Sequence, residues 1–333
     1  MTTFRRLFSV AALLLLGACS GAVVVEPGSG FGAGWTPAAA SVRSVGLGLP
    51  GGARLAEGVR FAGGLELVLE DASPLHSLSD LKLVDEDDFV SVTDAGDLVS
   101  GRLRLNPAGR LTGLEALRFR RLTLIDGRPI VEKVEGDAEG VAIDANGDLL
   151  VSFERDHRIW NYGAPLGPNA TPVPMRGPET VFALNDGMEG MAAGPDGGWR
   201  VAGESGGVWD CSPARCAVVV APPEPLLGDS DYRITGMDRD PSRQGWFVVQ
   251  RSYSPPIDAR AAVRRMAPDG SLGPVLIELK LPGTTDNFEG IAAVARGAAV
   301  ARGDAVRLYI LSDDNGSDRQ RTLLLAFDVT SDR

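Results

Sequence analysis

One short word recurs along this chain and sets a period that few folds can accommodate. The stretches GDAEGVAID, NDGMEGMA and TDNFEGIAA each place Asn or Asp shortly before Glu-Gly, and an apolar run follows. Two degenerate copies, HSLSDLKLV and YRITGMDRD, carry Ser and Thr where the others carry Glu. The marker residues of the five copies stand 60, 50, 46 and 54 residues apart, in the order Ser79, Glu139, Glu189, Thr235 and Glu289. Spacing of this kind predicts a structural unit repeated along the chain.

Each copy continues with the same succession of short elements. An apolar strand leads to a turn such as DANGD or GPDGG, and a second strand follows, for example LLVSFER, WRVAGES or WFVVQR. A third strand comes next, and usually a fourth precedes the following copy. The chain has 42 glycines and 22 prolines, and helical periodicity is absent. These features predict an all-β fold, a β-propeller with five visible four-stranded repeats.

The last copy ends after its third strand, which leaves one blade incomplete. The segment GVRFAGGLELVLE, residues 58–70, precedes the first copy and could supply the missing outer strand. We therefore expect an N-terminal strand to close the ring, which would pair two otherwise exposed sheet edges. A sixth, degenerate blade near residues 45–75 is the alternative, so the sequence is compatible with five or six blades.

Two positions in each repeat are expected to face the mouth of the central channel. The first is the marker, on the strand that lines the channel. The second follows 15 residues later in four copies, and an insertion moves it in the fifth, which gives Asp94, Glu154, Glu204, Gln250 and Asp313. Constant spacing across a hairpin places both positions at the same height in every blade.

Acidic side chains converging on one axis repel each other, so either some are protonated or a cation lies among them. Oxygen ligands with few histidines favour Ca²⁺ over Zn²⁺. The loop SDDNGSDRQ adds Asp313, Asp314 and Asn315, although its spacing differs from that of an EF-hand. The alternative is structural: the acids pair with neighbouring blades, and Gly140 and Gly190 only permit close packing of blades.

A further motif, GESGG, matches the G-x-S-x-G nucleophile elbow, with Ser205 as the nucleophile. That elbow requires a strand-to-helix turn, and no amphipathic helix follows here. Only His76 and His157 could serve as its base. We expect His157 to be a residue at the channel rim or a packed loop histidine, and we do not favour a serine triad.

Residues 1–19 read as an export signal. Arg5 and Arg6 precede a short apolar run, and LGAC ends at Cys19. This ending resembles the bacterial lipobox, in which the cysteine becomes the lipidated first residue. Ordinary secretion with cleavage near Ala18 or Ala22 is the alternative.

From this signal we expect a protein that is lipid-anchored to a membrane, the outer membrane facing the periplasm. Residues 20–43 are rich in Gly, Ala and Pro and predict a flexible tether. Residues 44–333 are then the propeller domain. An oxidising compartment favours a local disulfide between Cys211 and Cys216 in DCSPARCA, a metal site being the alternative. The net charge of −11 argues against nucleic acid as a partner, and we expect a monomer.

The words DAEGVAID, LLVSFERDHRI, LNDGMEGMAA, YRITGMDRDP and DNFEGIAA, in this order, resemble the bacterial family called esterase-like activity of phytase. The resemblance covers about residues 60–330 and implies a phytase-like propeller that hydrolyses phosphate or ester bonds. On residues that match the family words, we expect catalytic groups at Glu139, Glu189, Glu289, Glu154, Glu204, Arg155 and Arg251. We expect substrate-binding groups at His157, Arg158, Asn185, Asn287 and Gln320. We expect metal ligands at Asp80, Asp94, Asp313, Asp314 and Asn315. Because the first and fourth repeats lack the marker Glu, the site should be lopsided.

The leading hypothesis is a phosphoesterase or esterase in which acids at the channel mouth hold Ca²⁺, while Arg155 and Arg251 bind a phosphate or a developing oxyanion. A non-catalytic propeller that binds a ligand or protein is the second hypothesis, and a lactonase-like hydrolase is the third. A propeller fold is compatible with all three.

Overall fold

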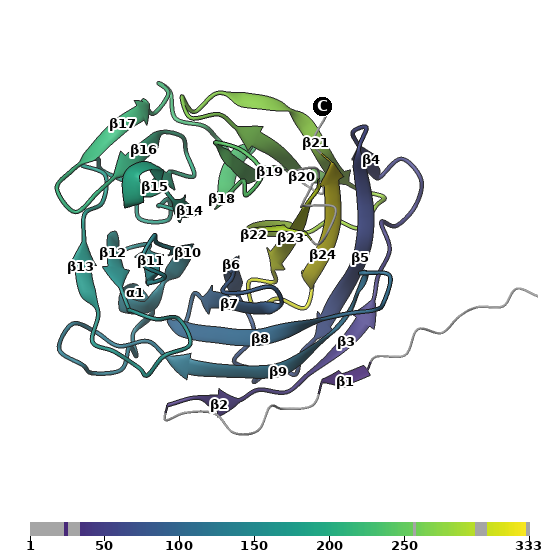
Figure 1. The fold of residues 1–333 in the computed structure, drawn as a ribbon, viewed down its shortest axis with the longest axis horizontal. Coiled ribbons are helices and arrows are strands. Elements are labelled where there is room, and N and C mark those ends of the chain that lie inside the picture. Colours follow the sequence, from purple (N-terminus) through teal and green to yellow (C-terminus); the bar gives the residue numbers. More distant parts are fainter. Residues whose placement is uncertain (1–22, 26–33, 256–257, 297–304, 331–333) are drawn as a thin grey trace, which may run out of the picture.

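The computed structural model describes residues 23–25, 34–255, 258–296 and 305–330. Their strands form five sheets arranged around a central axis as a five-bladed β-propeller (Figure 1). The prediction of an all-β propeller is confirmed, with five blades and no sixth among the described residues. Two short helices interrupt the strands, α1 (Lys133–Gly136) and the 3₁₀ helix η1 (Pro195–Gly197). The described residues contain no helix that is long and apolar enough to cross a membrane.

Each blade is an antiparallel sheet whose first strand is innermost. Blade 1 contains β6 (Leu78–Leu83), β7 (Asp88–Thr93), β8 (Asp97–Leu105) and β9 (Leu111–Arg121). Blade 2 contains β10 (Ala138–Ile143), β11 (Leu149–Phe153), β12 (Arg158–Asn161) and β13 (Val173–Met175). Blade 3 contains β14 (Gly190–Ala193), β15 (Trp199–Ala202), β16 (Val208–Cys211) and β17 (Cys216–Val220). Blade 4 contains β18 (Arg233–Arg239), β19 (Trp246–Ser254), β20 (Asp258–Met266) and β21 (Leu272–Lys280).

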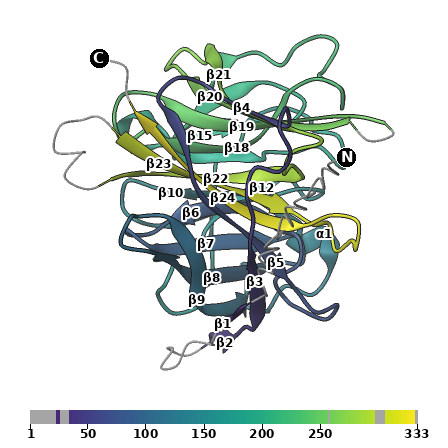
Figure 2. The ribbon, with the colours of Figure 1, turned by 90° about the vertical axis from the view of Figure 1, so that its right-hand side faces the viewer.

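Blade 5 is completed by the N-terminal part of the chain, as the sequence predicts. It contains β22 (Asn287–Ala295), β23 (Ala305–Asp313) and β24 (Thr322–Thr330), and β5 (Val59–Val68) pairs antiparallel with β24. The N-terminal segment runs along the outside of the ring (Figure 1, Figure 2), where its other strands are β1 (Val23–Val25), β2 (Thr36–Pro37), β3 (Ala40–Ser44) and β4 (Ala53–Leu55). Of these, β1 and β3 extend blade 5, β2 extends blade 1 and β4 extends blade 4.

The expected boundary between tether and propeller at residue 43 is wrong. β2 pairs with β9, and β3 pairs with β5. Ala38, Ala40 and Val42 are buried in the apolar cluster between blades 1 and 5. Buried and more exposed side chains alternate along this segment, as they do in a strand with one face on the core, so residues 36–44 belong to the propeller. The export signal and Cys19 lie outside the described residues.

The core is divided among the gaps between blades. Each of five apolar clusters combines residues from two neighbouring blades. In β11, Val151 faces the cluster shared with blade 1, whereas Leu150 faces the cluster shared with blade 3. Successive side chains of a strand point to opposite faces, and both faces are covered. This explains why the second strands read as continuous apolar runs.

The glycine after the marker is required by the close approach of neighbouring inner strands. A Cβ on Gly236 would lie 2.1 Å from the carbonyl oxygen of Glu289, and one on Gly140 would lie 2.7 Å from that of Glu189. The glycine of the Glu-Gly pair is therefore needed for the packing of neighbouring blades, as the structural interpretation expects. Its Glu is not needed for this packing and can have another role.

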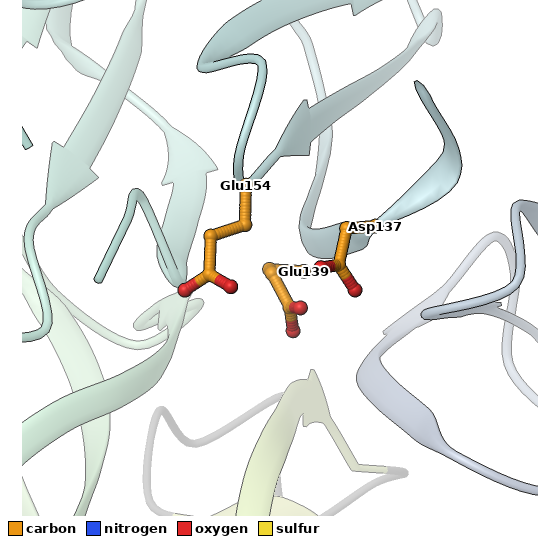
Figure 3. A group of neighbouring side chains, drawn as sticks. All are labelled: Asp137, Glu139 and Glu154. Carbon is orange, nitrogen blue, oxygen red and sulfur yellow. The ribbon is translucent and has the colours of Figure 1, made fainter. Parts of the chain in front are cut away.

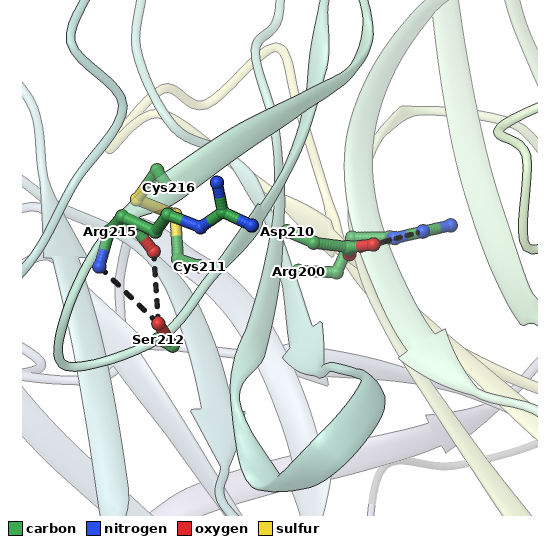
Figure 4. The surroundings of a disulfide bond; sticks show 6 residues. All are labelled: Arg200, Asp210, Cys211, Ser212, Arg215 and Cys216. Atoms are coloured by element: carbon green, nitrogen blue, oxygen red, sulfur yellow. Dashed lines mark hydrogen bonds and ion pairs between the residues drawn. A yellow bond between two sulfur atoms is a disulfide. The ribbon is translucent and has the colours of Figure 1, made fainter.

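The predicted disulfide between Cys211 and Cys216 is present and joins β16 to β17 (Figure 4). Beside it, Arg200 is almost fully buried and binds Asp210 through two hydrogen bonds of 2.7 and 2.8 Å. Arg200 also donates to the carbonyl oxygen of Pro268 and lies over the ring of Trp246 in blade 4. This arginine thus ties blade 3 to blade 4.

Candidate functional site

The marker position lies at an irregularity of the inner strand in four of the five blades. The pairing between the first and second strands shifts register across Ser79, Glu139, Thr235 and Glu289. Such β-bulges re-aim a side chain. In blade 3, Glu189 immediately precedes β14. The repeat therefore presents one side chain per blade toward the same region.

The cavity that these side chains approach has a volume of about 210 Å³ and lies on the propeller axis, and every blade contributes to its lining. Four of the five marker residues line it, Ser79, Glu139, Glu189 and Glu289, whereas the hydroxyl of Thr235 donates to the carbonyl oxygen of Phe288. Three cationic side chains also line it, Lys133, Arg155 and Arg251. They face eight carboxyl groups, those of Asp94, Asp137, Glu139, Glu154, Glu189, Glu204, Glu289 and Asp313. The predicted convergence of acids on the axis is observed, and the cavity is strongly acidic. We call it the acidic cavity.

Three of these carboxyl groups form the tightest group, which we call the acidic triad. Asp137 directly precedes β10, Glu139 lies in β10, and Glu154 follows β11, so all three belong to blade 2. One oxygen of each lies within 4.8 Å of the others. Figure 3 shows the three carboxyl groups turned toward a common space. Sets of oxygen ligands at this spacing can hold a hard divalent cation.

The cations near the triad neutralise only one of its members. Arg155 binds Asp137, and Lys133 lies 3.1 Å from the same residue and also binds Asp94. Within the described residues, the carboxyl groups of Glu139 and Glu154 form no hydrogen bond or ion pair. Nearby, the Oε2 atom of Glu189 is buried without a hydrogen-bond partner. The arrangement therefore has an excess of negative charge that the protein itself does not neutralise.

Burial, together with this excess of negative charge, raises the pKa values of the acids. Burial, followed by the charges of Asp137 and Glu204, raises the pKa of Glu154 to about 7. Burial and the charge of Glu289 hold the pKa of Glu139 well above its ordinary value. Burial also raises the pKa of Glu289 to about 7, although the neighbouring Arg251 acts in the opposite direction. At neutral pH, the metal-free cavity retains protons on some of these groups.

On the other side, Arg251 ties three blades together. Its guanidinium donates to Glu204 Oε1 at 2.7 Å and to the side-chain oxygen of Asn287, and it lies 3.3 Å from Glu289 Oε1. Asn287 donates to the same oxygen of Glu289 at 2.7 Å. Arg233 also lies 2.8 Å from Glu204. The structural interpretation of the acids thus holds for Glu204 and Glu289, but not for the acidic triad.

Two predicted metal ligands lie apart from the acidic cavity. Asp80 is fully buried, binds Lys82 at 2.7 Å and accepts hydrogen bonds from the backbone N–H groups of Leu81 and Val141. Asp314 accepts hydrogen bonds from the N–H of Ser77 and from the Thr322 hydroxyl, and lies 2.7 Å from the ring of His76. These two carboxylates do not line the acidic cavity, and backbone and side-chain donors engage them, so they are not brought together with the other predicted ligands.

Three predicted substrate-binding residues also lie outside the acidic cavity. Arg158 packs over the rings of Phe153 and Trp160. His157 donates to the carbonyl oxygen of Ala183, its ring 5.3 Å from that of Phe182, and so is a packed loop histidine. Gln320 accepts a hydrogen bond from Asn315 and lines other cavities. In each case a neighbouring aromatic ring, carbonyl or amide engages the side chain.

The remaining predicted residues reach the site. Asn185, Asn315, Asp94 and Asp313 line the acidic cavity, and Asn287 supports it through Arg251. Ser205, by contrast, is followed by β16 rather than by a helix, and its N–H donates to Asp186. The structure does not provide the strand-to-helix turn that a nucleophile elbow requires.

Asp137 and Lys133 line the cavity but were not predicted from the repeats. Asp137 stands two residues before its marker, as Asn287 does before Glu289. This shared offset could have identified it. Lys133 lies in α1, a helix that the other described connections between blades do not contain, and no sequence signal marks it.

The comparison with known proteins agrees with the recurring words. A family model described as phytase-like, esterase-like activity of phytase, matches residues 73–316. The chain belongs to this phytase-like family. No curated protein matches the sequence.

Solved structures with a similar fold are very distant in sequence from this member of the phytase-like family. A gluconolactonase from Xanthomonas campestris is 13% identical, with 86% of this chain and 97% of that chain covered and a TM-score of 0.43. A PQQ-bound aldose sugar dehydrogenase from Streptomyces coelicolor is also 13% identical, with 82% and 100% covered and a TM-score of 0.44. The virginiamycin B lyase of Staphylococcus aureus is 10% identical, with 84% and 86% covered and a TM-score of 0.38. These likenesses carry no argument about function.

Proposed function

We propose that the protein is a hydrolase of phosphate or carboxylic esters that works at the acidic cavity with a bound divalent cation, Ca²⁺ in the first instance. The family match supports a hydrolase of this general kind. The observation that carries the proposal is the acidic triad, in which the carboxyl groups of Glu139 and Glu154 form no hydrogen bond or ion pair with any described residue.

The residues present fit such a cation. Carboxylate oxygens are the ligands that Ca²⁺ prefers, and the protein offers three of them within 4.8 Å of one another. Two of the three, those of Glu139 and Glu154, form no ion pair with any described residue, whereas Asp137 would have to share its carboxylate with Arg155 and Lys133. Burial, with the charges of neighbouring carboxylates added to it, raises the pKa values of Glu139 and Glu154, and a cation bound among these groups would stabilise their charged forms. When bound, a divalent cation supplies Lewis-acid stabilisation of the oxygen that becomes negative during hydrolysis.

Two further side chains of the acidic cavity, Glu289 and Arg251, can take part in the hydrolysis of an ester. Hydrolysis places a water oxygen on phosphorus or on the acyl carbon, breaks the ester bond and transfers one proton from the water to the leaving oxygen. We assign Glu289 as the group that accepts this proton, because a pKa of about 7 suits general acid–base catalysis at neutral pH. Arg251, 3.3 Å from Glu289, lies where its charge can stabilise a developing oxyanion.

The proposal is tested with protein stripped by EDTA and then reloaded with Ca²⁺, assayed on a phosphomonoester, phytate, an aryl ester and a lactone. We expect turnover of at least one ester by the Ca²⁺-loaded protein and its loss with EDTA. Glu289→Gln should lower kcat by about 100-fold, a typical contribution of general base catalysis. Calcium binding without turnover of any substrate would instead favour the non-catalytic binding propeller.

We also propose that the protein is exported and held at a membrane through Cys19, so that the acidic cavity would act on substrates in the periplasm. The basic residues, short apolar run and LGAC ending of residues 1–19 support this proposal. Metabolic labelling with a fatty acid should mark the wild-type protein and not the Cys19→Ala variant. Unlabelled wild-type protein would contradict the lipid anchor.

A further inference from the structure

A second, larger cavity borders the acidic cavity and has the opposite charge. Its volume is about 750 Å³, and both Arg251 and Asn315 line the two cavities. Two acids line it, Asp229 and Asp286. Four arginines line it as well, Arg233, Arg251, Arg319 and Arg321. We call it the arginine cavity.

The four arginines differ in how many contacts hold their guanidinium groups and in how exposed they are to solvent. Arg233 and Arg251 both form ion pairs with Glu204, Arg233 also lies 2.8 Å from Asp229, and the two arginine side chains are 14% and 23% exposed. Arg321 donates to the carbonyl oxygen of Thr285 at 3.0 Å and lies 3.4 Å from Asp286. Arg319 is exposed, and its guanidinium makes no hydrogen bond or ion pair with any described residue. Each guanidinium carries five N–H donors, so the set retains donors for an anion.

The same cavity also has an apolar component. Tyr253 and Leu281 line it with 41% and 50% of their surfaces exposed, and Ala259 lies with them. Large side chains with apolar surface, beside arginines that retain N–H donors, form a surface suited to a molecule that is apolar at one end and anionic at the other.

We propose that the arginine cavity binds the anionic group of the substrate, an oxyanion such as phosphate or carboxylate attached to an apolar body. This inference rests on the proposed function, since it assigns the substrate class of the same site. An acidic cavity alone repels anionic esters. The adjoining arginines attract them and hold them beside Arg251, where the two cavities meet. Arg319 is the residue we assign to selecting for a charged substrate over a neutral one.

The first test measures binding alone, with EDTA-treated protein and no turnover. Phenylphosphonate, which has no ester bond to hydrolyse, is titrated calorimetrically, with benzoate as the carboxylate probe and benzyl alcohol as the neutral one. We expect the two anions to bind and the alcohol not to. Arg319→Glu should weaken phenylphosphonate binding by about tenfold or more, since a charge-assisted contact is lost and a repulsive one added. The matched control is Arg176→Glu, an exposed arginine that lines neither cavity.

The outcome separates this proposal from the hydrolase proposal. Binding that is weakened by Arg319→Glu but not by Arg176→Glu upholds the arginine cavity, even if no ester is turned over. Absent binding of both anions, or equal affinity in wild type and Arg319→Glu, overturns it. If the hydrolase is active, Arg319→Glu should raise KM for 4-nitrophenyl phosphate by more than it raises KM for the neutral 4-nitrophenyl acetate. Equal effects on the two substrates would contradict the assignment of Arg319.

Discussion

Replacing Glu139 with Gln is expected to stabilise the metal-free protein while removing its metal-dependent hydrolysis. Burial and neighbouring carboxylates raise the pKa of Glu139, so its charged form is unfavourable in the fold. The amide has nearly the same shape and no charge, and we expect the free energy of unfolding to rise by about 0.5–2 kcal/mol. Loss of one oxygen ligand should lower kcat/KM by about 100-fold or more.

Thermal unfolding in EDTA and initial rates with Ca²⁺ measure the two effects in the same preparation. The control is Glu57→Gln, an exposed glutamate between β4 and β5, which should change neither quantity. A variant of Glu139 that is less stable than wild type, or fully active, would show that this residue holds the fold together instead of holding a cation.

The second large effect is an unusual dependence of stability on pH. Folding raises the pKa of Glu154 and Glu289 from their ordinary value of 4.5 to about 7. Between these values the folded protein binds protons that the unfolded chain has lost, so its stability falls as pH rises. The contribution is fully present below about pH 4.5 and is lost as the pH passes about 7. Because a tenfold change in a proton-binding constant corresponds to about 1.4 kcal/mol, the two groups together should contribute a few kcal/mol.

In EDTA, the unfolding temperature should therefore increase by several degrees when the pH is lowered from 8 to 5. Asp314 does not offset this change, because its lowered pKa affects stability only below this range. Ca²⁺ should raise the unfolding temperature at pH 8 and have little effect at pH 5, where protons occupy the carboxylates. An unfolding temperature that falls on acidification from pH 8 to pH 5 would contradict the proposed electrostatics of the cavity.

The fold could be predicted because the same residue pattern recurs in every blade. A marker, a glycine that admits the neighbouring strand and a second position 15 residues later recur along the chain, and they carry enough constraints to place the acids on one axis. The closing strand was also predictable, since an incomplete last repeat and an unassigned strand before the first one complete each other.

The predicted site residues that the structure places outside the acidic cavity depend on single contacts that do not recur from blade to blade. Asp80 and Asp314 look like further ligands in the sequence, but donors from Lys82 and Thr322 engage them. Arg158 belongs to aromatic packing, which a motif does not reveal. Arg251, Asn287 and Gln320 were predicted and line the arginine cavity, but its other arginines were not, because Arg233 and Arg319 come from different blades and lie 86 positions apart in the chain. Such contacts depend on how the blades are arranged in three dimensions, which the sequence pattern does not give.

A calorimetric titration of Ca²⁺ into EDTA-treated protein at pH 8 tests the central claim most directly. We predict that wild-type protein binds the ion at a stoichiometry of about one per chain, since the acidic triad forms one such group, and that Glu139→Gln loses this binding while Glu57→Gln keeps it. Wild-type protein that binds no divalent cation, or a Glu139→Gln variant that binds Ca²⁺ as well as wild type, would contradict the claim.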